Sequence, residues 1–352
     1  MPEKTRLPID RFAFAKQFVT DGTYSDKYFL RAQQILQADQ RDPNVLMQIF
    51  CRTPGTLCGM DEAIAMLKYG TENFAQLQVH ALHDGDHIEA WETVMTIEGP
   101  YQQFAHLETV YLGVLARGTR VATQMSQVVA TAAGRDVLFF GARHDHPATQ
   151  VADGYAALIG GAAAVASDAQ GKTLNKPGVG TIPHALIAAY DGDSVTAAQK
   201  FVDVMPDDVA LIALVDFDND CVGTSLAVAK ALGRRLAGVR LDTSASMVDV
   251  SLTQEEPPQT GVTPGLVTNV RHALDQAGYD WVNIIVSGGF DATRVAEFVS
   301  SGVAVDAFGV GSSILRNYGS HDFTADIVQV NGKAMAKVGR ELRPNSRLSL
   351  VN

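Results

Sequence analysis

The segment 282–313 constrains the fold most, because it predicts two consecutive parallel strands that each end in glycines. Val282–Val286 and Val303–Phe308 are β-branched runs, and the residues between them carry apolar side chains at helical spacing. Parallel strands joined by a helix end at the same edge of a sheet, where glycines let backbone N–H groups approach an anion. The alternative is that these glycines only make tight turns. We predict a phosphate-binding glycine cradle made of Ser287, Gly288, Gly289, Gly309, Gly311 and Ser312.

The second half of the chain alternates between strand-like and helix-like segments. Helical patterns such as Val222–Leu232 and Val267–Ala277 lie between β-branched runs. This alternation predicts parallel strands, and fewer than eight clear strands predict an incomplete (β/α) barrel of the TIM type. The strand candidates are Asp136–Phe140, Ala162–Ala166, Val209–Val215, Leu236–Arg240, Val282–Val286 and Val303–Phe308.

The first 115 residues predict a separate α/β domain. A helix is expected from Asp26 to Asp39 with Ser25 as its N-cap, and another over Met60–Tyr69. The runs 76–82 and 87–98 alternate with a period of two about Asp84-Gly85-Asp86, which predicts a hairpin.

The long helical stretch that begins at Leu107–Arg117 is expected to pass from this domain into the barrel at residues 116–319. A hairpin about Asn331-Gly332, within residues 320–352, is expected to lie outside the barrel and to return to the domain at 1–115.

Composition narrows the classes of partner. The 352 residues carry a formal charge of −11 with a pI near 5.2, which argues against nucleic acid as a partner, because phosphate backbones bind basic surfaces. The cysteines, Cys51, Cys58 and Cys221, fit neither a zinc ribbon nor a disulfide framework and are expected to be reduced. No apolar run reaches membrane-spanning length without charges or glycines, so we expect no membrane partner and a cytoplasmic location.

Polar residues follow the strand candidates at the points where these end. In a barrel such residues converge on one face. Arginines, histidines and carboxylates around a phosphate site suit a phosphorylated small molecule with a divalent cation. Individual polar residues of this set also have purely structural explanations: Asp220 would serve as a helix cap and His146 as a surface residue. The strand-end segments are Gly141–His146, Ser167-Asp168, Asp216–Asp220 and Arg240–Ser244.

Short motifs in a fixed order resemble the nicotinate phosphoribosyltransferases, within the type II phosphoribosyltransferases that include the quinolinate and nicotinamide enzymes. The resemblance covers nearly the whole chain. It implies an N-terminal α/β domain with an incomplete barrel, and a homodimer or higher homo-oligomer with active sites shared between subunits. It also implies transfer of phosphoribosyl from phosphoribosyl pyrophosphate (PRPP) to a pyridine nitrogen in NAD synthesis. The motifs are Gly-Thr-Tyr-Ser-Asp-Lys-Tyr-Phe at 22–29, Asp-Gly-Asp at 84–86, Ile-Glu-Gly-Pro at 97–100, Phe-Gly-Ala-Arg at 140–143, Gly-Thr-Ile-Pro-His at 180–184, Gly-Val-Arg-Leu-Asp-Thr-Ser at 238–244, Ser-Gly-Gly-Phe-Asp at 287–291 and Phe-Gly-Val-Gly-Ser-Ser at 308–313.

The resemblance also implies roles for the substrate-binding residues. Phe140 resembles the aromatic residue that stacks on the pyridine ring, and Arg143 the arginine beside ring and phosphate. Tyr28, with Tyr24 as the alternative, matches a tyrosine that reaches across the dimer. Asp168 lies where the nicotinamide enzyme has an aspartate facing its ligand's amide, and a carboxylate there would repel nicotinate.

Catalytic and metal roles follow from the same comparison. Arg240 and Asp242 resemble the pair that handles PRPP and its Mg²⁺, with Asp216 as a further candidate Mg²⁺ ligand. Asp218 is not assigned, because the run 216–220 departs from the family pattern. His184 matches the histidine that relatives phosphorylate from ATP as co-substrate.

Four alternatives compete with a nicotinate enzyme: a quinolinate enzyme, a nicotinamide enzyme, a sugar-phosphate aldolase or isomerase, and a non-catalytic sensor. Quinolinate is a dianion and would require more basic residues than Arg143, Lys172, Lys176 and Arg240. Nicotinamide carries an amide in place of the carboxylate, and the carboxylate of Asp168 would suit that amide. A sugar-phosphate aldolase or isomerase would need a lysine at a strand end, and no strand candidate ends in one. A non-catalytic PRPP sensor would have lost the arginine and acidic positions, which this chain retains.

Overall fold

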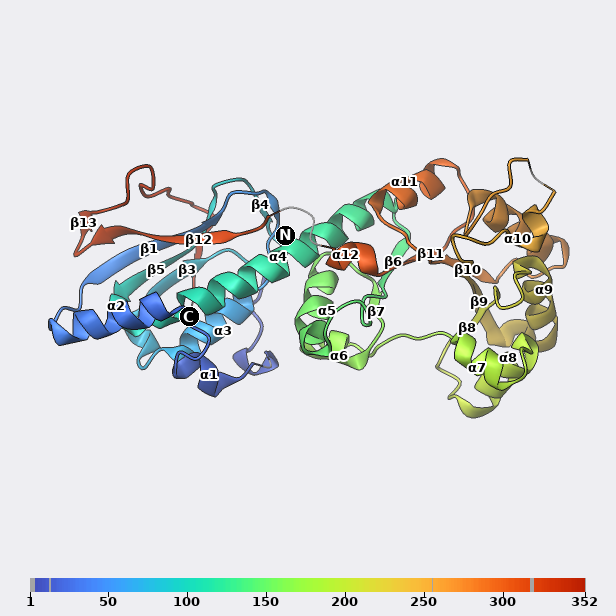
Figure 1. Ribbon diagram of the computed structural model, residues 1–352, viewed down its shortest axis with the longest axis horizontal. Helices are drawn as coiled ribbons and strands as arrows, with labels where there is room; N and C mark the ends of the chain where they lie inside the picture. Colours follow the sequence, from blue (N-terminus) through green and yellow to red (C-terminus); the bar gives the residue numbers. More distant parts are fainter. Residues whose placement is uncertain (1–3, 13, 255, 317–319, 352) are drawn as a thin grey trace.

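The computed structural model describes residues 4–12, 14–254, 256–316 and 320–351, so the expected domain limits at 1, 319 and 352 lie outside it. Two lobes, each built on a six-stranded sheet, are joined by the long helix α4 (Glu108–Thr131) (Figure 1). This confirms the predicted fold class, an N-terminal α/β unit with an incomplete barrel of parallel strands. No helix in the described ranges is long and apolar enough to cross a membrane.

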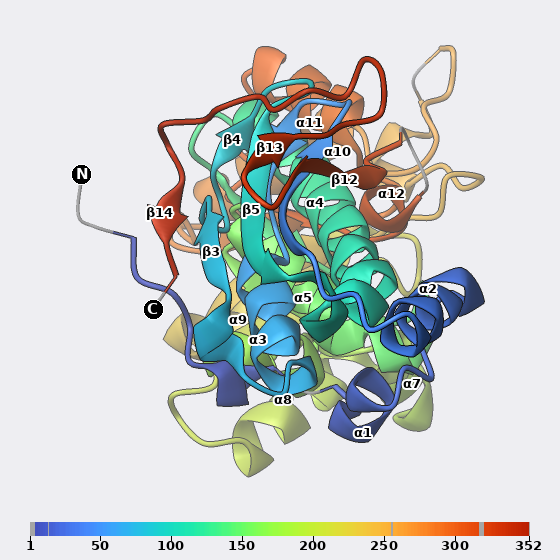
Figure 2. The same ribbon diagram turned by 90° about the vertical axis from the view of Figure 1, so that its left-hand side faces the viewer.

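The sheet of the N-terminal lobe is antiparallel and has the order β13-β12-β1-β5-β3-β14. The C-terminal strands therefore lie beside strands from the first hundred residues (Figure 2). Small strands β2 (Gly55–Thr56) and β4 (His87–Ile88) pair separately. The lobe's other elements are β1 (Asn44–Cys51), β3 (Gln78–Ala81), β5 (Thr93–Pro100), β12 (Phe323–Val330), β13 (Lys333–Ala334), β14 (Ser349–Leu350), α1 (Lys16–Thr20), α2 (Lys27–Ala38) and α3 (Met60–Gly70).

One local prediction in this lobe is wrong, and another is correct in its strand pairing but not in its turn. Ser25 is not the N-cap of α2, because its hydroxyl donates to the carbonyl of His106 and Asp26 occupies the cap position. The predicted hairpin pairing is present, since β3 runs antiparallel to β5 with Ala81 opposite Met95, but a longer connection that contains β4 replaces a tight turn about Asp84-Gly85-Asp86. Asp84 instead accepts from the N–H of Met60 at 2.7 Å, at the start of α3, so the turn serves to cap a helix.

The second lobe is a half-barrel of parallel strands in the order β7-β6-β11-β10-β9-β8. Its strands are continuous apolar runs because helices cover them, as is usual for parallel sheets. The strands are β6 (Asp136–Phe139), β7 (Ala164–Val165), β8 (Leu211–Leu214), β9 (Leu236–Leu241), β10 (Asn283–Val286) and β11 (Ala307–Val310). The helices are α5 (Gln150–Ile159), α6 (Asp168–Gly171), α7 (His184–Ala189), α8 (Ser194–Val204), α9 (Cys221–Leu232), α10 (Pro264–Gln276), α11 (Ala292–Ser300) and α12 (Ser312–Leu315).

The last barrel strand lies later in the chain than predicted. It begins at Ala307 rather than Val303 and includes Gly309, which the sequence had placed in a turn. A Cβ on Gly309 would lie 2.6 Å from the Phe140 ring, so the glycine is needed inside the strand for side-chain packing. Gly309 therefore contributes to the site by admitting Phe140.

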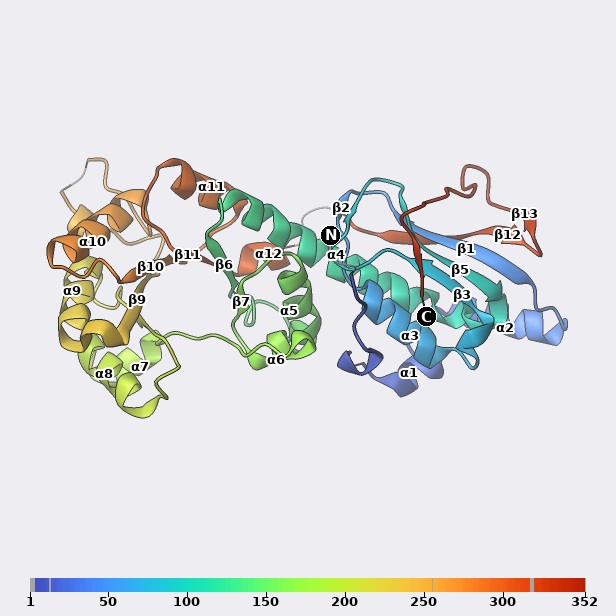
Figure 3. The same cartoon turned by 180° about the vertical axis from the view of Figure 1, so that it is seen from behind.

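Helix α4 belongs to both hydrophobic cores. Tyr111 and Leu115, near its start, are fully buried against the first sheet, whereas Val121 and Met125 pack into the half-barrel core. Burying one such large side chain contributes about 1.5–3 kcal/mol. Figure 3 shows α4 passing from the N-terminal lobe to the half-barrel, where α5 and α12 lie beside it.

Candidate active site

A cavity of about 670 Å³ opens where the half-barrel strands end. Its walls come from residues that directly follow β6, β9 and β10, from β11 and the start of α12, and from the segment 179–185. In barrels this edge of the sheet carries the binding site. The predicted residues in its lining are Phe140, Arg143, His184, Arg240, Asp242, Ser287, Gly288, Gly289, Gly309, Gly311 and Ser312.

The glycine cradle has the backbone geometry that an anion site requires. Gly288 and Gly289 have φ of 95° and 73°, a left-handed conformation that costs other residues roughly 1–2 kcal/mol. Within the described ranges, no hydrogen bond occupies the N–H groups of Gly288, Gly289 or Gly311. The hydroxyl of Ser313 donates to the carbonyl of Phe290 at 2.8 Å and so connects the two turns. These free donors belong to residues that line the cavity, where a phosphate can accept from them.

Arg240 and Asp242 form a connected network with Ser287. The Arg240 guanidinium donates to Asp242 Oδ2 at 2.9 Å, to Ser287 Oγ at 2.8 Å and to Thr181 Oγ1 at 3.1 Å. The buried Ser287 hydroxyl in turn donates to Asp242 Oδ1 at 2.6 Å. The network thus fixes one cation and one carboxylate next to the cradle.

An aromatic surface and a free cation lie beside this network. The Arg240 guanidinium carbon is 5.2 Å from the centre of the Phe140 ring, a cation–π contact. Arg143 is exposed, lines the cavity and has no hydrogen-bond or ion-pair partner among the described residues. A planar anionic ring can therefore stack on Phe140 and pair with Arg143.

His184 and Asp216 form a second polar pair at the cavity wall. His184 opens α7, and its Nε2 lies 3.0 Å from Asp216 Oδ1. Burial raises the pKa of Asp216, while His184 lowers it and Asp242 raises it further. An ionised Asp216 can only accept, so it holds the proton on His184 Nε2 and leaves the Nδ1 lone pair free.

Three predicted binding residues lie outside the cavity lining: Asp168, Tyr28 and Asp216, of which Asp216 contacts the lining residue His184. Asp168 is exposed and accepts from the N–H of Gly178 at 2.9 Å, so its carboxylate orders the following loop. Tyr28 is 61% exposed at the start of α2, a helix of the N-terminal lobe, whereas the cavity belongs to the half-barrel. The alternative Tyr24 is also exposed, at 48%, and packs edge-on against Phe18.

The simpler explanations hold for two strand-end residues. Asp220 caps α9 by accepting from the N–H of Gly223 at 2.8 Å. His146 is exposed and accepts from the N–H of Ala148, capping a short turn.

The candidate metal ligands are two carboxylates. No three His, Cys, Asp or Glu side chains in the described part of the chain converge on one point. Asp216 and Asp242 are nevertheless close enough that Asp242 influences the pKa of Asp216. Mg²⁺ commonly takes one or two carboxylates and completes its shell with water and substrate phosphates, so these two are the candidate ligands; both oxygens of Asp242 already accept hydrogen bonds, from Arg240 and Ser287.

Several lining residues carried no individual role in the sequence analysis, among them Thr181 and Phe290. Thr181 could have been noticed, because it directly follows Gly180 in the motif that ends at His184. His144 adjoins Arg143, and a Cβ on Gly311 would lie 2.8 Å from its ring. Close approach of that kind depends on packing between strands and leaves no local sequence signal.

Comparison with known families agrees with this geometry. Residues 26–119 match the N-terminal domain of quinolinate phosphoribosyl transferase, and residues 121–323 match its C-terminal domain. The chain belongs to this family of type II phosphoribosyltransferases. The family resemblance read from the sequence motifs is therefore confirmed.

Curated relatives include nicotinate phosphoribosyltransferases. The Bacillus subtilis enzyme is 28% identical over 242 residues, 68% of this chain and 46% of its own length. The Mycobacterium tuberculosis H37Rv protein pncB2 is 28% identical over 268 residues, 74% of this chain and 53% of its own length. The chain thus spans about half the length of the curated relatives it matches.

Solved structures extend the comparison to nearly the whole chain. Nicotinate-nucleotide pyrophosphorylase from Pyrococcus furiosus has a TM-score of 0.81 and 33% identity, covering 97% of this chain and 85% of its own. Human nicotinic acid phosphoribosyltransferase has a TM-score of 0.71 over 90% of this chain and 77% of its own. At 17% identity, the human structure shows the shared fold alone.

Proposed function

We propose that this protein is a phosphoribosyltransferase of NAD synthesis that transfers phosphoribosyl from PRPP to the nitrogen of nicotinate, giving nicotinate mononucleotide and pyrophosphate. The observation that carries the proposal is one cavity that combines a glycine cradle, the Arg240–Asp242–Ser287 network, the Phe140 ring and an unpaired Arg143. Each is a part that this reaction needs.

The reaction breaks the bond from ribose C1 to pyrophosphate and forms a bond from C1 to the pyridine nitrogen. Positive charge develops on the ribose, so the protein needs no covalent nucleophile. It has to orient the nitrogen behind C1 and to stabilise the leaving group. The cradle N–H groups fit the 5′-phosphate, Phe140 orients the ring, and Arg240 supplies positive charge near the pyrophosphate. Mg²⁺ held by Asp242 and Asp216 would add charge neutralisation of the pyrophosphate.

Nicotinate fits the charges of the cavity better than the two other bases. Of the described residues, only Arg143 and Arg240 supply arginine side chains to the cavity, and Arg240 is already paired with Asp242. One free arginine matches the single carboxylate of nicotinate. Asp168, whose charge argued against nicotinate, lies outside the lining and so does not oppose this base.

Quinolinate is the second candidate. The family model that matches both halves of the chain is that of quinolinate phosphoribosyl transferase. Its second carboxylate would need a further cation, which His144 could supply when protonated.

The deciding experiment is incubation of the protein with PRPP, Mg²⁺ and each base in turn, with and without ATP. We expect nicotinate mononucleotide as the main product. Turnover of quinolinate with release of CO₂, and none of nicotinate, would assign the second candidate. No turnover of any base would contradict the transferase itself.

We further propose that ATP stimulates the reaction through His184. Transfer of the γ-phosphoryl group to Nδ1 would form a phosphohistidine and release ADP, with Asp216 steadying the ring through Nε2. His184→Asn should abolish stimulation by ATP and leave a slower ATP-independent transfer. Full stimulation in this variant, with an unchanged ratio of ATP hydrolysed to nucleotide formed, would make His184 structural.

We also propose a homodimer in which Tyr28 of one subunit completes the cavity of the other. Support comes from the exposed position of Tyr28 on α2 of the N-terminal lobe, outside the lining of the cavity of its own chain.

A further inference from the structure

The segment that carries the free cation of the cavity is exposed. Residues 141–149, which we call the pocket loop, connect β6 to α5 and include the lining residues Arg143 and His144. Residues 143–148 are all exposed, and Arg143 has no partner among the described residues. An exposed loop samples several conformations unless its neighbours restrain it. The position of Arg143 therefore depends on what holds the loop.

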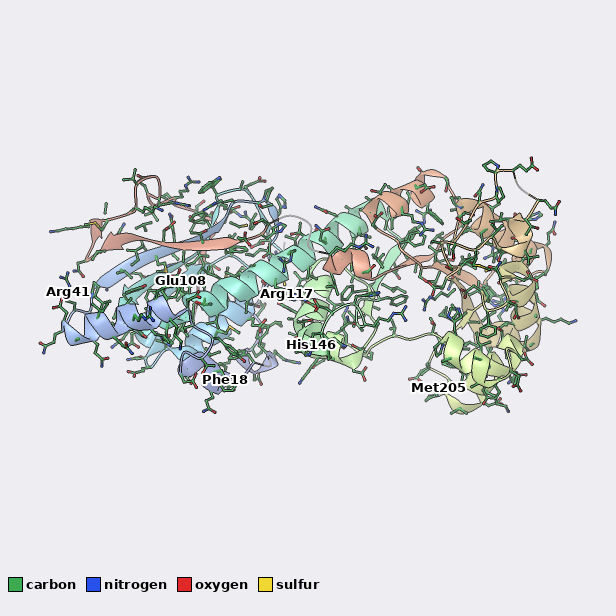
Figure 4. The ribbon with its side chains drawn as sticks, in the orientation of Figure 1. Phe18, Arg41, Glu108, Arg117, His146 and Met205 are labelled. Carbon is green, nitrogen blue, oxygen red and sulfur yellow. The ribbon has the colours of Figure 1, made fainter. Side chains whose placement is uncertain are left out.

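Helix α4 provides one restraint through Arg117. Its Nε lies 2.7 Å from Asp153 Oδ1, and its Nη2 lies 2.9 Å from Asp153 Oδ2 and 2.8 Å from Asp145 Oδ2. Asp153 is buried on α5 and also accepts from Thr149 Oγ1 at 2.8 Å. Arg117 points from α4 toward α5 and the pocket loop, where His146 also lies (Figure 4). One side chain thus connects the helix between the lobes to the loop beside the cavity.

A second restraint acts at the start of the loop. Gln150 Nε2 donates to the carbonyl of Ala142 at 3.1 Å, and Gln150 Oε1 accepts from Ser167 Oγ at 2.9 Å. This contact fixes the side of the loop before Arg143. Asp145 fixes the side after it, so the two restraints enclose Arg143 and His144.

We propose that the pair Arg117–Asp145 is a positioning device that holds the pocket loop so that Arg143 and His144 face the carboxylate of the pyridine base. The orientation toward a base carboxylate rests on the proposed function. The hydrogen bond from Arg117 lowers the pKa of Asp145, which keeps the pair ionised at neutral pH. An arginine is required, because its planar group reaches two carboxylates at once, whereas a lysine presents one point charge.

The test compares Asp145→Asn with Asp207→Asn as a matched control. Asp207 is also an exposed aspartate paired with an arginine, Arg235, but it lies away from the cavity. Asp145→Asn should raise KM for the base five- to twentyfold, with kcat and KM for PRPP within twofold of wild type. Asp207→Asn should change neither constant. Asp145→Glu, which restores the charge, should bring the logarithm of KM for the base at least halfway back to its wild-type value.

Amide hydrogen exchange over residues 140–150 gives a readout that does not depend on turnover. We expect faster exchange there in Asp145→Asn and in Arg117→Lys, and unchanged exchange in Asp207→Asn. A wild-type protein inactive on nicotinate would refute the proposed function, and the exchange rates would still decide whether the pair holds the loop. An active wild type with unchanged KM in Asp145→Asn, or with unchanged loop exchange, would overturn the positioning role.

Discussion

Replacing Ser287 by alanine should weaken the use of PRPP without unfolding the protein. The side chain is 3% exposed and makes two charge-assisted hydrogen bonds, from Arg240 and to Asp242. Each such bond contributes about 1.5–3 kcal/mol. Arg240 keeps its bonds to Thr181 and Asp242, and both charged side chains are about one-fifth exposed, so water recovers part of the loss. We expect a net cost of about 2 kcal/mol, or roughly 30-fold in kcat/KM for PRPP.

The assay is steady-state turnover with PRPP varied at saturating base, together with the thermal unfolding temperature of each variant. Ser313→Ala is the matched control, because Ser313 is also buried near the cradle but donates only to the carbonyl of Phe290. Its kcat/KM for PRPP should stay within threefold of wild type. If Ser287→Ala behaves like Ser313→Ala, the network does not position Arg240 and Asp242 for PRPP.

Three further predictions follow from the geometry. Gly289→Val should raise KM for PRPP at least tenfold. Gly302→Val is the control, because Gly302 has a similar φ of 72° and open space around it, and this change should lower stability without changing KM for PRPP. Equal KM values for PRPP in the two variants would contradict the glycine cradle. Mixing Tyr28→Ala with Arg240→Ala should restore roughly a quarter of wild-type activity after subunit exchange, and no restoration would refute the shared site. Burial raises the pKa of Glu62 from 4.5 to about 7 in the folded protein. Between these pH values the side chain ionises in the unfolded chain but not in the folded one, so the free energy of unfolding falls as pH rises, by about 3 kcal/mol at most. Glu62→Gln should therefore raise the unfolding temperature at pH 8 but not at pH 4, and an equal gain at both values would refute the assignment.

The strands and the side of the barrel that carries the site could be predicted from the sequence. Buried parallel strands are mostly apolar, and each predicted run overlaps a strand of the half-barrel, although the last strand begins at Ala307 rather than Val303. The placement of Arg240 and Asp242 at the site follows from their position at a strand end, because the end of a parallel strand determines which edge of the sheet its residues reach. The convergence of Phe140, Arg240 and Ser287 on one cavity required only this rule.

Other features depend on contacts between distant segments and could not be predicted. Gly309 was placed in a turn because glycine has a strong local preference for turns, but packing against Phe140 decides its position inside β11. Asp168 was predicted to face the ligand, but its carboxylate accepts from the N–H of Gly178, and this contact depends on the path of the following loop. Arg117 and Asp145 are 28 residues apart, and nothing local to either indicates their pairing.

The two arginines of the cavity differ in what they can offer a substrate, and this difference bears on the choice of base. Arg240 is paired with Asp242 and donates to Ser287, so a substrate carboxylate that recruited it would compete with Asp242 for its guanidinium group. Removing one member of a partly buried ion pair costs free energy, because the remaining charge stays poorly solvated. Arg143 carries no such cost, since no described partner has to be displaced. A base with one carboxylate uses Arg143 alone, whereas a second carboxylate must compete with Asp242 or depend on protonation of His144. The preference for a monocarboxylate that we propose therefore rests on how the cations are already paired, and not only on how many there are.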